Sequence, residues 1–188
     1  MSLFTRSFPK WLPIGVAVTL VIGISYVFVQ QSYRMGANDP QITVARDTAA
    51  ALAAGTPADQ LVSNEKVDPS NSLAPFVIVL DANGSVVVAS MQVGGATPLP
   101  PAGVLDTAKS TGENRVTWQP RADARIAAVV VPVKGGPGGY VVAGRSLAAV
   151  EERIDQLTQM AGLGWFGSLL LTFGAVLLAD WMTERATA

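Results

Sequence analysis

Four residues in the middle of the chain are the strongest candidates for binding chemistry. They follow one another at short spacing: Arg115, Trp118, Arg121 and Arg125. A guanidinium group holds a carboxylate through two parallel hydrogen bonds, and an indole ring offers a stacking wall. The set would therefore suit a small organic acid or an amino acid as ligand. A solvated turn with a tryptophan at a sheet edge explains the same residues, and we favour that plainer interpretation.

Several kinds of chemistry are missing from this sequence. It contains no cysteine and no histidine, which removes thiolate nucleophiles, cysteine metal sites and the commonest general base. Serine, lysine and aspartate are scattered without a nucleophile motif. We therefore expect no enzymatic activity and no cofactor. We assign no metal site, and Ca²⁺ or Mg²⁺ bound by oxygen atoms stays an open alternative. The net charge of −1 provides no basic field, so we expect no nucleic-acid partner.

Two apolar segments indicate a membrane protein. Only 14% of the residues are charged, against about 25% in a typical soluble domain. Residues 11–29 and residues 162–182 are each long enough to cross a bilayer, which takes about 20 residues. The first carries no charge and the second only Asp180. A cleaved signal peptide is the alternative for the first segment, but no small-x-small cleavage site follows it, and we favour an uncleaved anchor.

The charges around the first segment predict a topology. Arg6 and Lys10 precede it and favour a cytoplasmic N-terminus, although Arg34 soon follows. We expect a two-pass protein of the cytoplasmic (inner) membrane of a bacterium, with the lipid bilayer as a partner. Residues 1–10 and 183–188 would then be cytoplasmic. Residues 30–161 would form a domain on the periplasmic or extracellular side.

Small residues recur four apart in both apolar segments. Such stripes permit close contact between membrane helices, within the chain or with another chain, but they are also common in membrane helices generally. The predicted helix–helix interface consists of Gly15, Thr19, Gly23, Gly164, Ser168 and Thr172.

The domain between the segments has an α+β pattern. Strands are predicted at residues 75–81, 85–90, 114–119, 125–133 and 140–144, and helices at 40–52, at 103–110 and from 147 onward. Asn83-Gly84 favours a tight hairpin between the first two strands. One five-stranded antiparallel sheet with helices against it is the economical arrangement. Arg145 precedes the exit helix, and we expect it to pair with Glu151 or Glu152.

Three stretches carry a resemblance to a known family: FVIVLDANGSVVVAS, RIAAVVVPVKGGPGGYVVAGRSL and AAVEERI. In this order, residues 30–159 resemble the Cache-type (PAS-like) extracytoplasmic sensor domains of membrane histidine kinases. The resemblance implies a PAS/Cache-like domain flanked by two transmembrane helices. It also implies a small-molecule pocket between the sheet and residues 91–111. A kinase needs a phosphoacceptor histidine, which is missing here, and the sequence ends six residues after Met182.

We therefore expect a sensor-like protein without the kinase part. It would pass ligand or assembly state through its transmembrane helices to a separate partner. That partner would be a second copy, giving a homodimer, or a membrane protein that carries the output. A structural or accessory subunit of a larger membrane complex is the alternative.

Overall fold

Two long helices lie at the ends of the chain in the computed structural model, which describes residues 3–36, 39–136 and 138–186. Helix α1 spans Leu3–Gly36 and helix α5 spans Ala148–Ala186. Both contain a segment long and apolar enough to cross a membrane, and the most apolar windows are only 6% and 0% buried. The prediction of two apolar helices is thus confirmed. Residues 1, 2, 187 and 188 of the expected cytoplasmic ends lie outside the described residues.

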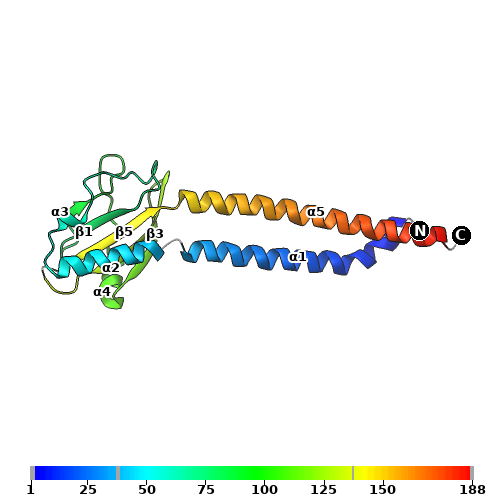
Figure 1. Ribbon diagram of the computed structural model, residues 1–188, viewed down its shortest axis with the longest axis horizontal. Coiled ribbons are helices and arrows are strands. Elements are labelled where there is room, and N and C mark those ends of the chain that lie inside the picture. The colour runs from blue at the N-terminus through cyan, green and yellow to red at the C-terminus, as the bar shows by residue number, and fades with distance from the viewer. Residues whose placement is uncertain (1–2, 37–38, 137, 187–188) are drawn as a thin grey trace. The chain divides into compact units, whose positions relative to one another are not determined.

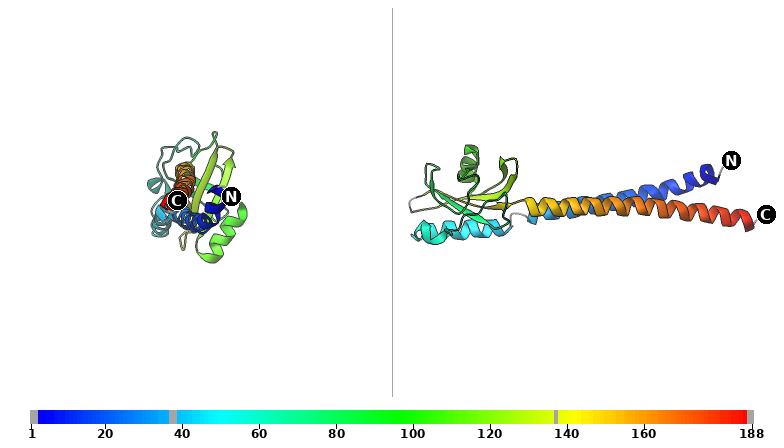
Figure 2. Two further views of the ribbon diagram at one scale, coloured as in Figure 1. Left: turned by 90° about the vertical axis from the view of Figure 1, so that its right-hand side faces the viewer. Right: turned by 90° about the horizontal axis from the view of Figure 1, so that it is seen from above.

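The chain divides into two units. One consists of Met1–Tyr33 together with Glu152–Ala188, and we call it the helix pair. The other consists of Arg34–Glu151, and we call it the sheet unit. In both Figure 1 and Figure 2, α1 and α5 lie side by side within the helix pair.

The sheet unit contains five strands: β1 (Phe76–Leu80), β2 (Val86–Ala89), β3 (Asn114–Arg121), β4 (Ala124–Pro132) and β5 (Tyr140–Ser146). Their order in the sheet is β2-β1-β5-β4-β3, and every neighbouring pair is antiparallel. The β1–β2 turn forms because the Asp81 carboxylate accepts the Asn83 and Ser85 N–H groups, while Gly84 adopts a φ of +82°. The predicted α+β class and five-stranded antiparallel sheet are confirmed.

Helices cover the two faces of this sheet. Helix α2 (Asp39–Ala53) lies on one face and α4 (Ala102–Thr111) on the other, as Figure 2 shows, and the short α3 (Ala58–Leu61) follows α2. Ala45, Ala49 and Leu52 recur at helical spacing on α2 and pack against valines of β4 and β5. On the opposite face, Ala108 of α4 joins a second apolar cluster. Strand β4 is therefore buried on both sides, as its continuous apolar sequence predicts.

Candidate functional site

The four predicted ligand-binding residues do not form one cluster. Side chains alternate along β3, so Arg115 and Trp118 belong to opposite faces of the sheet. Trp118 packs against the apolar cluster on the α4 side, and its indole N–H is buried without a hydrogen-bond partner among the described residues. Arg115 lies instead beside Glu113, with Nε 2.9 Å from Oε1.

Each of the other two arginines has an acidic partner of its own. Arg121 Nη2 lies 2.5 Å from an Asp123 oxygen; this hydrogen bond raises the pKa of Arg121 and lowers that of Asp123. Arg125 Nη1 lies 2.8 Å from Glu151 Oε1, in the first turn of α5. That ion pair differs from the expected one, because no ion pair to Arg145 is present within the described part of the chain. A ligand role for these arginines stays a prediction.

The space beneath residues 91–111 is occupied by apolar side chains. Met91 and Ala108 are fully buried there against Phe76 and Ile78 of β1, and Leu105 packs on the same cluster. The implied ligand pocket between this segment and the sheet therefore coincides with a hydrophobic core.

An ion triad joins α2 to the start of β3. Gly112 ends α4 in the left-handed conformation, with a φ of +84°, and the chain then turns to Glu113. The Glu113 carboxylate accepts from Arg46 Nη2 at 2.7 Å and from Arg115 Nε at 2.9 Å. Each carboxylate oxygen thus faces a different guanidinium group. Burial raises the pKa of Glu113, but these hydrogen bonds from Arg115 and Arg46 outweigh it, so the pKa lies below its usual value.

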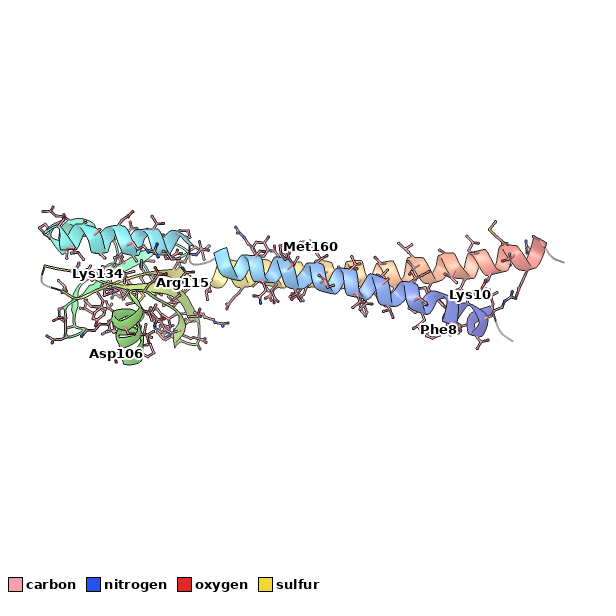
Figure 3. The ribbon with its side chains drawn as sticks, turned by 90° about the horizontal axis from the view of Figure 1, so that it is seen from below. Phe8, Lys10, Asp106, Arg115, Lys134 and Met160 are labelled. Carbon is pink, nitrogen blue, oxygen red and sulfur yellow. The ribbon has the colours of Figure 1, made fainter. Side chains whose placement is uncertain are left out.

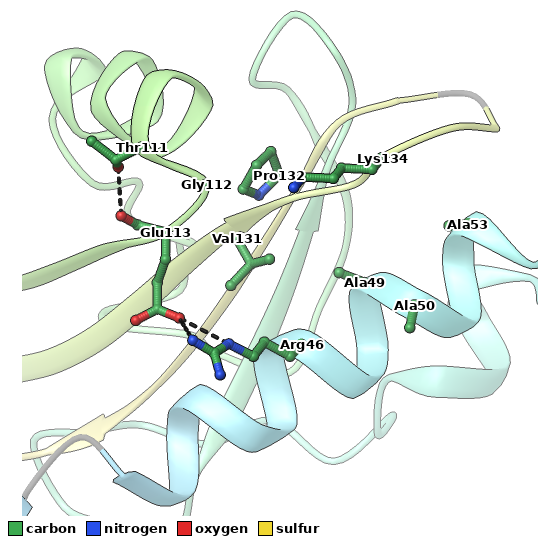
Figure 4. A pocket seen from close by; sticks show the side chains of 10 residues that line it. All are labelled: Arg46, Ala49, Ala50, Ala53, Thr111, Gly112, Glu113, Val131, Pro132 and Lys134. Carbon is green, nitrogen blue, oxygen red and sulfur yellow. Dashed lines mark hydrogen bonds and ion pairs between the residues drawn. The ribbon is translucent and has the colours of Figure 1, made fainter.

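A groove of about 480 Å³ opens next to this triad, entirely within the sheet unit (Figure 4). Its walls come from three elements: α2, the end of β4 and the α4–β3 turn. The lining residues are Arg46, Ala49, Ala50, Ala53, Thr111, Gly112, Glu113, Val131, Pro132 and Lys134. Lys134 is exposed and has no ion pair among the residues that the structure describes. In Figure 4 its side chain extends toward Pro132.

Residue type and spacing in the sequence do not single out Arg46, Glu113 or Lys134. Arg46 and Glu113 are 67 residues apart in the chain, and only the packing of α2 on the sheet brings them together. One local signal was present: Arg46 directly follows Ala45, the first buried alanine of the α2 apolar stripe. A side chain one position along a helix from the buried stripe lies at its border, where a long cation can reach a neighbouring element.

Polar side chains join α1 to α5 inside the helix pair. Near the chain ends, Asp180 is 6% exposed and accepts from Ser7 Oγ at 2.6 Å and from Lys10 Nζ at 2.5 Å. Lys10 is labelled in Figure 3 at this end of the pair. Further along, the hydroxyl groups of Tyr26 and Thr158 share a hydrogen bond of 2.8 Å. Because hydrogen bonds require a particular donor–acceptor geometry, these contacts restrict sliding and rotation of one helix against the other, in addition to side-chain packing.

Two of the predicted small residues take part in this interface, through hydroxyl groups. Trp11 Nε1 donates to Thr172 Oγ1 and Trp165 Nε1 donates to Thr19 Oγ1, both at 2.9 Å. Gly15 is buried, and a Cβ there would lie 3.0 Å from the Trp11 ring of its own helix.

The other three predicted residues show no hydrogen bond to the facing helix among the described residues. Gly23 and Gly164 have open space where a Cβ would lie. Ser168 donates to the Gly164 carbonyl of its own helix. Whether this stripe contacts another chain stays a prediction.

No protein-family model and no curated protein sequence matches this chain. No group of three or more acidic, histidine or cysteine residues that could hold a metal ion occurs among the described residues.

Proposed function

We propose that this chain is a non-catalytic, membrane-anchored, extracytoplasmic protein of the sensor type, which acts on a separate partner through its transmembrane helices. The bonding at the start of α5 carries the proposal. The Leu147 N–H donates to the Arg125 carbonyl at 2.9 Å, and the Arg125 side chain binds Glu151. A shift of β4 would therefore act on the first turn of α5. That helix continues without interruption to Ala186 and includes the second apolar segment.

The resemblance to Cache-type domains supports the same proposal. The sheet has five antiparallel strands, and residues 91–111 cover one face of it through α4. We propose the topology expected from the sequence, with both termini cytoplasmic and residues 30–161 periplasmic or extracellular. Since the chain has no cysteine, single engineered cysteines test this cleanly. A membrane-impermeant maleimide should label Asp106→Cys in intact cells, and Ala186→Cys only after permeabilisation. The reverse pattern would refute the topology.

Capture of a partner tests whether the chain acts on another protein through α5. The full chain, purified from native membranes in mild detergent, should bring down a second copy or an output protein. A single photo-cross-linker near the end of α5 should join the two. Arg125→Gln removes the side-chain tie to α5 and should change the cross-linking yield. Arg153→Gln, an exposed α5 arginine with no ion pair among the described residues, is the matched control. Purification of a lone monomer would count against this action on a partner. Equal cross-linking yields from Arg125→Gln and Arg153→Gln would also count against it.

A structural or accessory subunit is the second candidate. It is favoured by the open space at Gly23 and Gly164 and by large apolar side chains exposed on the helix pair, such as Phe28 and Leu171. If these surfaces hold a neighbouring protein, Gly23→Leu and Gly164→Leu should abolish stoichiometric co-purification. Arg125→Gln should leave it intact. The sensor proposal expects a change of cross-linking with Arg125→Gln, so the same variants separate the two functions.

A further inference from the structure

We propose that the groove beside Arg46 binds a small monocarboxylate with a short apolar body. The inference rests on the proposed sensor function, for which it names the ligand class. It places ligand binding on the α2 side of the sheet, whereas the resemblance implies a pocket on the α4 side. The charge, the floor and the size of the groove all favour such a ligand.

Charge favours an anion. Arg46, Arg115 and Lys134 are cations at or beside the groove, and Glu113 is the carboxylate that lies against two of them. Because Glu113 already receives both guanidinium groups, Lys134 is the cation left to meet an incoming group. An ammonium group donates charge-assisted hydrogen bonds to a carboxylate. The surplus of positive charge also draws anions toward the groove.

The floor of the groove consists of short, apolar side chains. Ala49 and Ala53 lie one helical turn apart on α2, and Val131 faces them from β4. Alanine side chains end at Cβ, so they leave room above the helix that longer side chains would fill. The step from Ala49 to Ala53 rises about 6 Å along the helix axis, which is the length of a chain of a few carbon atoms. The floor can therefore bury a short alkyl group next to the cation.

The size of the groove agrees with a small ligand. Its volume of about 480 Å³ lies within the range of about 300–1,000 Å³ for small-molecule sites. A bare inorganic anion would leave the alanine floor exposed to water. A neutral molecule of the same shape would leave Lys134 without a partner. The combination of cation and apolar floor thus selects a carboxylate with an alkyl tail.

Butyrate is the probe, and the full-length protein in nanodiscs of zwitterionic lipid is the target. Ligand-detected NMR titration should give saturable binding of butyrate, and butyramide and inorganic phosphate should not compete. Lys134→Gln should weaken butyrate binding about tenfold or more, the effect of losing one charge-assisted hydrogen bond. Lys109→Gln is the matched control, because Lys109 is exposed on α4 outside the groove and its loss should change nothing.

A second variant guards against a folding artefact. Ala50→Leu keeps every charge but fills the groove from an exposed position of α2, and it should also abolish butyrate binding. The inference is overturned if butyrate does not saturate, if butyramide or phosphate competes equally, or if either groove variant binds like the native chain. Its failure is distinct from failure of the proposed function. Partner capture and the effect of Arg125→Gln are measured without butyrate.

Discussion

Replacing Gly144 by alanine should destabilise the sheet unit, because this glycine lies where three groups meet. Gly144 pairs with Phe76 on β1 and with Ala128 on β4. A Cβ at this position would lie 2.6 Å from Phe76 Cζ and 2.9 Å from both the Ala127 carbonyl oxygen and Ala128 Cβ. The Phe76 ring is 1% exposed and cannot swing into solvent. The Ala127 oxygen belongs to β4 and cannot move without disturbing the pairing of β4 with β5.

The expected magnitude follows from two opposing effects. Overfilling a packed core costs about 1–3 kcal/mol. Alanine recovers about 0.4–1 kcal/mol, because it lowers the conformational entropy of the unfolded chain. The free energy of unfolding should therefore fall by about 1–2 kcal/mol. For a unit of this size, each kcal/mol lowers Tm by roughly 4 °C.

Hydrogen exchange of the β5 amides in the full chain measures this loss where it occurs. Gly103→Ala is the matched control, since nothing lies within 4 Å of the added methyl group in α4. It should be neutral or stabilising by up to about 1 kcal/mol. Phe76→Leu removes Cζ and should rescue part of the Gly144→Ala loss, so the two changes should not be additive. Equal stability of Gly144→Ala and the native chain, or additive losses in the double variant, would refute the packing argument.

Two further predictions concern charged groups. The pKa of Glu113 is lower in the folded chain than in the unfolded chain, so its ion pairs stabilise the fold above the unfolded pKa. This contribution is lost as the pH falls through the folded value; thermal unfolding should show an acid-dependent loss that Glu113→Gln reduces. In the helix pair, Asp180→Asn should weaken the contact with Ser7 and Lys10 and lower bismaleimide cross-linking between Phe4→Cys and Phe173→Cys. Asp155→Asn, an exposed α5 control, should leave the cross-linking yield unchanged. Equal yields from Asp180→Asn and the native chain would contradict the prediction.

Local patterns predicted the elements of this fold well. The apolar runs on either side of Asn83-Gly84 predicted β1 and β2. The continuous apolar run of residues 125–133 predicted β4, an interior strand covered on both faces. Both are short-range signals, in which the residues that decide the structure are neighbours in sequence. The same holds for the two apolar helices, because a stretch of about 20 predominantly apolar residues is by itself enough to predict a long apolar helix.

The contacts between elements could not be predicted in the same way. Arg125, rather than Arg145, binds Glu151, because the Leu147 N–H pairs with the Arg125 carbonyl and so sets that residue beside the first turn of α5. The groove needs Arg46 and Glu113 from distant parts of the chain. A pattern gives the face on which a side chain lies, whereas its partner depends on register and on which helix covers that face.

Two tryptophan hydrogen bonds restrict how α1 and α5 can move against each other. Trp11 of α1 donates to Thr172 of α5, and Trp165 of α5 donates to Thr19 of α1. Between helices whose surfaces are mostly apolar, such hydrogen bonds act together with van der Waals packing in setting how the helices associate. Sliding or rotating one helix by a turn would break both bonds together with the Asp180 contacts. We therefore expect α1 and α5 to move as one body. Under the proposed sensor function, the effect on a partner would then pass through the outer surfaces of the helix pair.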